Sequence, residues 1–334
     1  MKKILLTGGT GFIGSHIAVE LIENNYEVYI IDNLCNSKKE VVDKIEKITD
    51  VKPSFEIIDI KNFEALDNYF SKNKFDAVVH LAGLKAVGES VKNPLEYYEN
   101  NVYGAINLLK CMIKHNVMNL IFSSSACVYG DCKNLPISET ENISIINPYG
   151  RTKYFIEEII ADVVKSNPKF NATILRYFNP IGAHKSGLIG EDPNDIPNNI
   201  MPYILKVACG EYECLNIFGK DYATEDGTGV RDYIHVLDLA SAHRCAIEHI
   251  FKFGGLNTYN LGTGKGTSVL ELVNAFMQQN GVKINYKFVA RRSGDGEAIY
   301  TNPSKAHKEL GWCAKYDIND MCKDAYNFIL KNKE

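Results

Sequence analysis

The sequence predicts an α/β protein in which a doubly wound parallel sheet is followed by a smaller C-terminal α/β region. First, short β-branched segments alternate with longer segments of helical periodicity in the first half of the chain. Second, a glycine-rich loop comes directly after the first of these short segments. Third, residues 180–202 are rich in proline and glycine, which predicts a long irregular loop, and the alternation is less regular after it. These observations place a boundary near residue 180.

The strands are expected where short runs are apolar at consecutive positions, as in strands covered on both faces of a parallel sheet. They are residues 4–7, 28–32, 55–59, 77–81, 120–123 and 173–176. A first helix follows the glycine loop, because Ile13, Ile17 and Leu21 recur every four residues and share one face. Two longer helices are expected over residues 100–115 and 149–165. Asn147 is suited to cap the second of these, and Pro148 to its first turn.

Composition excludes several classes of protein. With 334 residues, 45% apolar and 23% charged, the chain has enough apolar side chains for a sizeable core and is not disordered as a whole. A net charge of −4 gives no basic field for nucleic acid or an anionic membrane, and no apolar run is long enough to span a bilayer. The apolar start of the chain is broken at once by glycines, so we expect a strand there and no export signal. Nine scattered cysteines without a CxxC pair indicate no metal site and a reduced, cytoplasmic protein.

The glycine loop, residues 7–14, is the strongest local signal. Gly8 and Gly11 keep the turn tight and let backbone N–H groups approach a pyrophosphate, and Gly14 permits close packing of helix against strand. Asp32 ends the second strand, where a carboxylate accepts the ribose hydroxyls of an adenosine and repels a 2′-phosphate. The sequence therefore predicts a Rossmann-type site for NAD. The alternative is a structural glycine turn with an incidental aspartate.

Two nearby features could point elsewhere. Lys38 and Lys39 could bind a 2′-phosphate, which would favour NADP. A second glycine cluster, residues 262–266, superficially resembles a P-loop but lacks the Gly-Lys-Ser/Thr order, so we do not assign it one.

Tyr149 and Lys153 are four residues apart and share one face of the predicted helix. A phenol with a pKa near 10 needs roughly 4 kcal/mol of help to act as a base at pH 7. An ammonium about 5 Å away, at an effective dielectric near 20, supplies roughly 3 kcal/mol, and a cationic nicotinamide can supply the rest. A serine-rich strand end, residues 123–125, lies where an open α/β sheet binds its ligand. The alternatives are a surface Tyr-Lys pair and serines that bind only local backbone.

Longer blocks carry a resemblance that covers nearly the whole chain. They are residues 8–16, 32–37, 82–90, 179–184, 227–235 and 291–295. Together with the Tyr-Lys pair they resemble the extended short-chain dehydrogenase/reductase family, and most closely its members that invert carbon 4 of UDP-linked hexoses. The glycine loop and the Tyr-Lys pair are common to the family, whereas the blocks after Asp32 and around Lys85 are more specific.

The resemblance implies interconversion of UDP-galactose and UDP-glucose through a transient 4-keto sugar with tightly bound NAD, a step of galactose metabolism. It implies an NAD-binding unit over residues 1–180, a UDP-sugar-binding unit over 181–334 from which some segments return to the first, and a homodimer formed through the two long helices. The implied catalytic residues are Tyr149, Lys153 and Ser125. The implied cofactor-binding residues are Gly8, Gly11, Phe12, Ile13, Gly14, Asp32, Asn33, Leu34, Cys35, Asn36, Ser37, Asp59, Ile60, Leu81, Ala82, Gly83, Leu84, Lys85, Asn100, Ser125, Tyr149, Lys153 and Phe178. The implied substrate-binding residues are Ser125, Tyr149, Asn179, Asn199, Ile200, Asn216, Ile217, Phe218, Arg231, Arg292, Asp295 and Ile299.

Two arginines suit a diphosphate, because a guanidinium is always charged and binds phosphate oxygens in pairs. For Arg231 the alternative is an ion pair with Asp226 or Asp232.

Three other functions are possible on the same scaffold. Nucleotide-sugar 4,6-dehydratases carry an Asp-Glu pair where this chain has Ala126 and Cys127, so elimination of water is disfavoured. A simple dehydrogenase would release NADH, and a cofactor-sensing binding protein would not need Tyr149, Lys153 and Ser125. Ile299 stands where relatives carry either a bulky aromatic or a small residue, so acceptance of UDP-N-acetyl sugars stays open.

Overall fold

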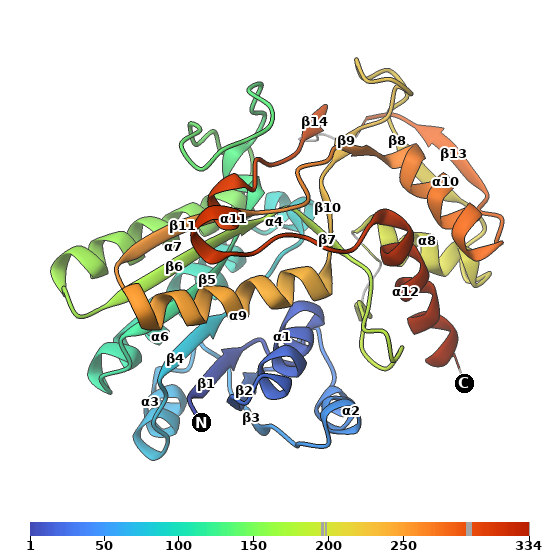
Figure 1. Cartoon of the computed structure of the whole chain (residues 1–334). Coiled ribbons are helices and arrows are strands. Elements are labelled where there is room, and N and C mark those ends of the chain that lie inside the picture. Colours follow the sequence, from blue (N-terminus) through green and yellow to red (C-terminus); the bar gives the residue numbers. More distant parts are fainter. Residues whose placement is uncertain (195–196, 198, 292–295, 334) are drawn as a thin grey trace.

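A seven-stranded parallel sheet forms the centre of the computed structural model, which describes residues 1–194, 197, 199–291 and 296–333. Its strand order is β11-β6-β5-β4-β1-β2-β3 (Figure 1). The strands are β1 (Lys3–Thr7), β2 (Glu27–Asp32), β3 (Ser54–Ile57), β4 (Ala77–His80), β5 (Asn119–Ser125), β6 (Asn171–Tyr177) and β11 (Leu256–Leu261). The doubly wound fold and the six expected strands are confirmed, and β11 is a seventh strand that the sequence pattern did not indicate.

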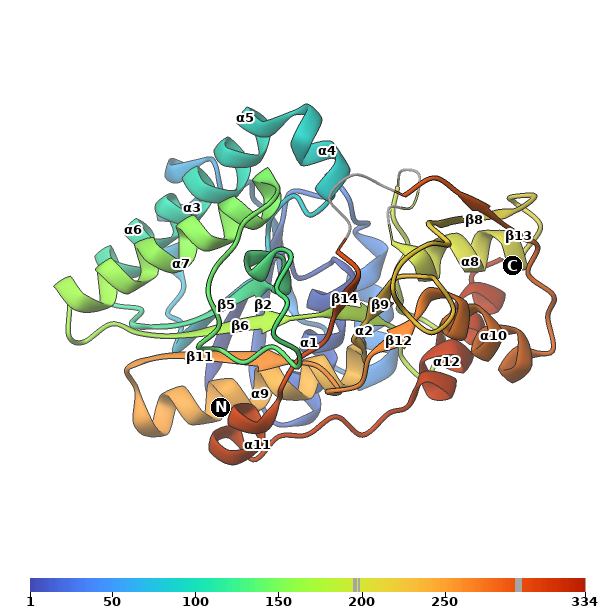
Figure 2. The ribbon, with the colours of Figure 1, turned by 90° about the horizontal axis from the view of Figure 1, so that it is seen from above.

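Helices cover both faces of the sheet (Figure 2). On one face lie α1 (Phe12–Glu23), α2 (Glu40–Thr49) and α9 (Val236–Phe253); on the other lie α3 (Phe63–Lys72), α6 (Gly104–Lys114) and α7 (Pro148–Ser166). β1 shows why both faces are apolar: Ile4 and Leu6 pack in the α1 and α9 layer, whereas Leu5 packs in the α3 and α6 layer. The consecutive apolar residues of the strand are thus all buried.

The two long helices differ in how well the sequence located them. Helix α7 agrees with the expected helix over residues 149–165, and the side chain of Asn147 caps it by accepting the Gly150 N–H at 2.8 Å. The helix expected over 100–115 instead begins at Pro94, as α5 (Pro94–Tyr97), and continues through a π-helical segment η1 (Tyr98–Tyr103) into α6. Such a π-helical turn often marks a functional position inside a helix.

The rest of the chain builds a second group of elements beside the carboxyl edge of the sheet. Its apolar core joins α8 (Ile200–Ala208), α10 (Val269–Asn280) and α12 (Ile318–Lys331) to the strand pair β8 (Leu215–Phe218) and β13 (Tyr286–Val289). Three short strands, β12 (Thr267–Ser268), β9 (Val230–Arg231) and β14 (Ala298–Ile299), form a small sheet. A further pair joins β7 (Asn179–Ile181) to β10 (Tyr233–His235). The remaining helices are α4 (Val87–Lys92), η2 (Ala126–Tyr129) and α11 (Ser304–Leu310).

The loop expected over residues 180–202 is therefore shorter than predicted. It begins within β7 and ends where α8 starts at Ile200. Pro202 does not prevent this, because a proline in the first turn of a helix removes no intrahelical hydrogen bond.

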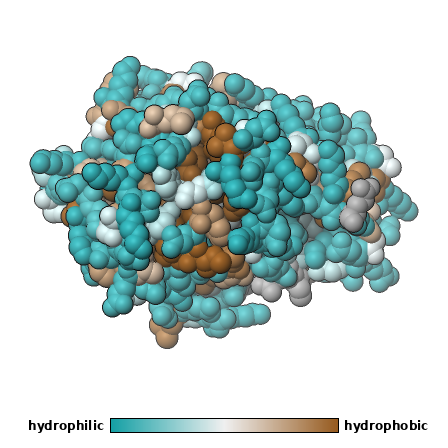
Figure 3. Space-filling view, turned by 90° about the horizontal axis from the view of Figure 1, so that it is seen from below, coloured by the Kyte–Doolittle hydropathy of each residue, from teal (hydrophilic) through white to brown (hydrophobic). Residues whose placement is uncertain are grey.

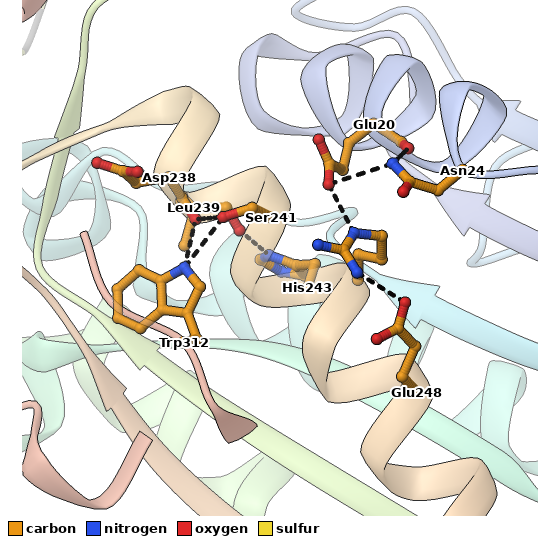
Figure 4. Close-up of polar contacts among 9 residues, drawn as sticks. Glu20, Asn24, Asp238, Leu239, Ser241, His243, Glu248 and Trp312 are labelled. Atoms are coloured by element: carbon orange, nitrogen blue, oxygen red, sulfur yellow. Dashed lines mark hydrogen bonds and ion pairs between the residues drawn. The ribbon is translucent and has the colours of Figure 1, made fainter. Parts of the chain in front are cut away.

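Helix α9 connects the two parts of the chain, since it comes after residue 180 but packs on the sheet beside α1. Arg244 on α9 donates to Glu20 Oε1 on α1 at 2.7 Å and to Glu248 at 2.7 Å. At the other end of α9, the Trp312 indole donates to the Asp238 carbonyl and to Ser241, both at 3.0 Å (Figure 4). The parallel sheet is consequently built from both sides of the predicted boundary.

The surface is mainly polar in the view from below, with apolar side chains gathered in small patches near its middle (Figure 3). Within the described parts of the chain, the structure contains no helix that is both long enough and apolar enough to cross a bilayer. All nine cysteines are free thiols.

Candidate active site

Most of the predicted cofactor residues gather at the carboxyl edge of the sheet, where they come from six separate parts of the sequence; Asn100, Tyr149 and Lys153 lie on η1 and α7. The segments 8–14, 32–37, 59–60 and 81–85 follow or end β1, β2, β3 and β4 respectively. Ser125 ends β5, and Phe178 follows β6. Ligands of open parallel sheets bind at this edge.

The glycine loop leaves no room for side chains. Gly8 has a φ of +72°, and a Cβ there would lie 2.8 Å from the Ala82 backbone nitrogen. A Cβ on Gly14 would overlap the Gly8 carbonyl, so the start of α1 packs directly on the loop. Gly11 is the N-cap of α1 and brings no side chain to cap it. The positive end of the helix is thus presented to a ligand, as a pyrophosphate requires.

Asp32 is held in a fixed position beside this loop. Its Oδ1 accepts the Leu34 N–H at 2.9 Å and the Ser37 hydroxyl at 3.1 Å, and its Oδ2 accepts the Thr10 N–H at 3.3 Å. A carboxylate has about four lone-pair sites, so one site remains for a ribose hydroxyl, and the negative charge repels a 2′-phosphate. Together with the glycine cradle, this donor and acceptor set fits NAD.

The remaining cofactor segments are also ordered by hydrogen bonds. The Asn33 amide donates to Asp59 Oδ2 at 3.2 Å, which joins the ends of β2 and β3. Lys85, after β4, donates to Glu191 at 2.9 Å. Ile60 is buried in the apolar core. Its side chain therefore has a packing role, and a ligand contact there falls to the backbone.

Tyr149, Lys153 and Ser125 lie together where α7 meets the end of β5. Lys153 Nζ donates to the Ser123 carbonyl at 2.8 Å and lies 5.9 Å from the centroid of the Tyr149 ring. Ser125 hydrogen-bonds to Tyr149, and its hydroxyl accepts the Cys127 N–H at 3.2 Å. All three residues are more than nine-tenths buried. The strand end and the helical face therefore meet as predicted.

Burial shifts the two titratable groups in opposite directions. Removal from water raises the pKa of Tyr149 well above 10, and the bond from Ser125 lowers it only in part. The same effect lowers the pKa of Lys153 to about 8, with Glu157 acting against it. Deprotonation of Tyr149 is thus harder than the solution pKa suggests, and it depends strongly on nearby positive charge.

A buried network beside Lys153 was missed by the sequence reasoning. Glu157 accepts a paired bond from the Arg176 guanidinium, from Nε to Oε1 at 3.0 Å and from Nη2 to Oε2 at 2.5 Å, and a further bond from Ser124. Arg176 Nη1 also donates to the Tyr129 hydroxyl at 2.9 Å. The available signal was spacing, because Glu157 follows Lys153 by four residues and continues the helical face that carries Tyr149.

The π-helical segment η1 places a second residue that the sequence reasoning missed. The Asn101 amide nitrogen donates to the Leu84 carbonyl at 3.0 Å and to the Thr152 hydroxyl at 3.1 Å, while its oxygen accepts the Leu84 N–H at 2.8 Å. The predicted residue, Asn100, donates to the same oxygen at 3.0 Å. Asn101 therefore joins the loop after β4 to the helix that carries Tyr149.

The predicted substrate residues lie on the second group of elements. Asn179 lies in β7, and Arg231 on β9 is in register with Ile299 on β14. Arg231 Nη1 donates to the Val230 carbonyl at 2.8 Å. Asn216 on β8 has a buried Oδ1 with no hydrogen-bond partner among the described residues, which suits a polar ligand.

Other predicted substrate residues are placed less uniformly. Asn199 is the N-cap residue of α8, which begins at Ile200, and its side chain donates to Glu191 at 2.7 Å. Ile217 is buried in the core of the second group, so its backbone alone faces the strand edge, whereas Phe218 is 43% exposed. Arg292 and Asp295 lie outside the described residues.

The carboxylates that could have paired with Arg231 bind other groups. Asp226 accepts the Thr228 N–H and hydroxyl at 2.8 and 2.7 Å. Asp232 accepts the Thr263 N–H at 2.8 Å and the Gly264 N–H at 3.0 Å. Both carboxylates thus order backbone loops around the arginine.

Comparisons with known proteins agree with this geometry. The family profile described as GDP-mannose 4,6 dehydratase matches residues 5–325. The UDP-glucose 4-epimerase of Mus musculus is 52% identical, over 99% of this chain and 98% of that protein. The crystal structure of the Bifidobacterium longum UDP-glucose 4-epimerase with NAD+ and UDP superimposes with a TM-score of 0.97 at 48% identity, covering 99% of both chains. That of Stenotrophomonas maltophila, with NAD and a formylated UDP-arabinopyranose, gives 0.97 at 45% identity, covering 100% and 99%.

Proposed function

Since the chain belongs to the UDP-glucose 4-epimerases, within the extended short-chain dehydrogenase/reductase family, we propose that Tyr149, Lys153 and Ser125 are its catalytic residues. The activity itself is the interconversion of UDP-galactose and UDP-glucose with NAD as cofactor. The observation that carries the assignment of residues is the meeting of these three side chains at the carboxyl end of β5.

When bound, NAD supplies a hydride acceptor for carbon 4 of the hexose. The same hydride is then available to the opposite face of that carbon. Tyr149 accepts the proton of the sugar 4-hydroxyl as the carbonyl forms and returns it to the oxygen afterwards. Ser125, which already bonds to Tyr149, holds that same hydroxyl in line. Proton transfer and oxidation are then linked within one buried site.

Lys153 makes this proton transfer feasible. Its bond to the Ser123 carbonyl fixes the ammonium beside the Tyr149 ring. With a pKa of about 8, Lys153 is still charged near pH 7, and its charge lowers the cost of forming a phenolate in a buried site. The positive charge of the oxidised cofactor adds to the same effect, so Tyr149 acts as a base only in the loaded site.

Elimination of water is disfavoured at this site even though the matching family profile is described as a dehydratase. Ala126 and Cys127 form the start of η2, directly after Ser125. Neither side chain can act as a carboxylate acid or base, which dehydration requires. The sugar therefore keeps its 6-hydroxyl, and only the configuration at carbon 4 changes.

Arg231, together with Arg292, is assigned to the diphosphate, and Asn179, Asn199, Ile200, Asn216, Ile217, Phe218, Asp295 and Ile299 to the rest of the nucleotide sugar. The unpartnered Oδ1 of Asn216 and the position of Arg231 between β12 and β14 support this assignment. The division into a cofactor unit, residues 1–180, and a UDP-sugar unit, residues 181–334, is part of the proposal. In it, α9 and β11 are the segments that return to the sheet.

We further propose a homodimer formed through α6 and α7. The outer layer exposes Phe155, 43% accessible, whose ring lies 5.9 Å from that of Tyr98, and Tyr103, 47% accessible. Aromatic side chains exposed together on a helical layer are typical of an interface. Light scattering on the purified chain measures the mass.

The nine free thiols support a reducing compartment, the cytoplasm.

The decisive experiment is incubation of the purified chain with UDP-galactose, without added NAD and then with it. Formation of UDP-glucose without a rise in absorbance at 340 nm is the expected result, since the cofactor ends each cycle oxidised. Stoichiometric NADH release would instead indicate a dehydrogenase, and a 4-keto-6-deoxy product would indicate a dehydratase.

A further inference from the structure

We propose that Asp232 is a positioning residue of the UDP-sugar site, because its backbone hydrogen-bonds to Asn179 and Ile299 and it directly follows Arg231 in the chain. The inference rests on the proposed function, which assigns these three residues to the substrate. Asp232 is fully buried and lies between β9 and β10, where the small sheet meets the β7 and β10 pair (Figure 1).

The carboxylate of Asp232 is enclosed by hydrogen-bond donors from two distant loops. Its Oδ1 accepts the N–H and the hydroxyl of Thr263, at 2.8 and 2.7 Å. Its Oδ2 accepts the Gly264 N–H at 3.0 Å and the Thr301 N–H at 3.1 Å. Successive backbone N–H groups curved around one anion form a nest, here filled by a side chain of the protein itself.

The second glycine cluster, residues 262–266, is explained by this nest. A Cβ on Gly262 would lie 2.5 Å from Asp232 Oδ2 and 2.5 Å from the Thr301 side chain, so only glycine lets the loop close on the carboxylate. Gly264 has a φ of +77°, which glycine adopts readily. The cluster that resembles a phosphate loop in the sequence thus binds an internal anion.

The backbone of Asp232 reaches the predicted substrate residues directly. Its carbonyl accepts the Asn179 N–H at 3.0 Å, and its own N–H donates to the Ile299 carbonyl at 3.1 Å. Arg231 precedes it in the chain and is in register with Ile299. A single residue therefore joins segments that carry the sugar contacts, the diphosphate contact and the residue beside the sugar 2-position.

Release of the carboxylate would shift these segments together while leaving the catalytic residues in place. Tyr149, Lys153 and Ser125 are ordered by β5 and α7, which the Asp232 carboxylate does not touch among the described contacts. We therefore expect loss of Asp232 to weaken binding of UDP and UDP-sugars with little change in kcat or in bound NAD.

The test is Asp232→Asn, which keeps the shape but turns an amide N–H₂ toward backbone donors. We expect the KM for UDP-galactose and the Kd for UDP, measured by calorimetry, to rise about tenfold or more, since the amide donor faces backbone donors and displaces the segments that carry Asn179, Arg231 and Ile299. The value of kcat should stay within about threefold, because the acid-base groups are unmoved. Gly262→Ala disturbs the same contact from the loop that faces the carboxylate. It should likewise raise KM and Kd with little change in kcat, and it does so without a change of charge.

Asp238→Asn is the matched control. Asp238 is as deeply buried, and its carboxylate accepts the N–H groups of Lys315 at 3.0 Å and Tyr316 at 3.1 Å, on the side of α9 drawn in Figure 4. It should lose thermal stability like Asp232→Asn but keep the UDP Kd.

Equal UDP affinity in Asp232→Asn and wild type, or an equal loss in Asp238→Asn, would overturn the proposal. If Asp232→Asn does not fold, Gly262→Ala decides in the same way. Absence of epimerase activity in the wild-type chain would refute the proposed function instead. The positioning role would still be tested separately, because UDP affinity is measured without turnover.

Discussion

Tyr149 and Lys153 illustrate how one cause, burial, disables a base and lowers the pKa of its cationic partner. The phenol is held protonated by desolvation, and the ammonium has a pKa of about 8. At pH 7 the pair is therefore inactive until a further positive charge arrives beside it. The Tyr149 phenol therefore stays protonated in the empty site, where no substrate proton is to be accepted.

The first prediction at the residue scale is that Tyr149→Phe lowers kcat by about 100-fold or more, as loss of a general base requires. Bound NAD and the affinity for UDP should change little, since the ring is kept. Steady-state conversion of UDP-galactose to UDP-glucose measures the effect. A variant with a near-normal rate would remove Tyr149 from the mechanism.

Ile299 carries the second prediction. It contacts the apolar cluster that contains Val128 and Phe178, and its backbone is held by Asp232. Ile299→Tyr adds a large ring beside the sugar 2-position and is expected to suppress activity on UDP-N-acetylglucosamine while sparing UDP-glucose. Paired assays on both substrates measure the ratio, with Ile299→Val as the control of smaller volume. Unchanged ratios in the tyrosine variant would contradict the role.

At the scale of elements, three consecutive serines connect β5 to α7 in three different ways. The Ser123 carbonyl accepts from Lys153, the Ser124 hydroxyl bonds to Glu157, and the Ser125 hydroxyl bonds to Tyr149. The catalytic helix is thus fixed to the strand end at three successive turns. Glu157 also ties both elements to β6 through Arg176.

The prediction at this scale concerns Glu157→Gln. It leaves the Arg176 guanidinium buried without its counter-charge, and breaking such a pair costs about 3–5 kcal/mol. A urea melt of the NAD-loaded protein should show this loss in the free energy of unfolding. Surface substitution Glu248→Gln, which breaks the exposed bond to Arg244, should cost less than about 1 kcal/mol. Equal losses in the two variants would mean that the buried network is not needed for stability.

The sequence predicted the elements whose boundaries have chemical causes. Asn147 and Pro148 locate the start of α7, and the glycine loop locates α1. The start at Pro94 was missed because η1 interrupts the α-helical period around Asn101, whose polar side chain is buried by tertiary hydrogen bonds. β11 was missed because its partner β6 is distant in the sequence, and pattern alone does not show long-range pairing.

In the candidate site, too, local sequence patterns predicted some residues, whereas others depend on contacts made only in the fold. Residues with a motif spacing, such as Tyr149 and Lys153, could be predicted, because the chemistry fixes their separation. Asn101, Glu157 and Asp232 could not, since each acts through partners that the fold alone brings near. The second glycine cluster was not assigned a phosphate, and the anion that its backbone binds, Asp232, lies 30 or more residues away in the sequence.

For the whole molecule, buried histidines predict how stability depends on pH. Burial lowers the pKa of His16 and His80 to about 3 and that of His243 to about 4. In the unfolded chain each titrates near 6.5, so unfolding takes up protons between these values. Stability is therefore lost as pH falls below about 6.5, by about 4 kcal/mol per pH unit once all three are charged in the unfolded state.

Denaturant midpoints between pH 7 and pH 4.5 measure this dependence. Between pH 6.5 and pH 4 the three histidines remove about 10 kcal/mol, which is comparable with a total stability of about 5–15 kcal/mol, so we expect a large fall of the midpoint over this range. His243→Asn, whose side chain can still bond to Ser123, should reduce the slope by one proton. A flat profile over this range would contradict the neutral, buried state of these histidines.

The place of β11 in the central sheet has a consequence for synthesis. Until residue 261 has left the ribosome, β6 is an edge strand with unpaired backbone groups, and the α1 side of the sheet lacks α9. A nascent chain of about 200 residues would therefore expose both a β-edge and an apolar surface, which are the features that promote aggregation. Translation products that stop before α9 are expected to depend on chaperones, whereas a chain that includes α9 and β11 covers the α1 face of the sheet and pairs β6.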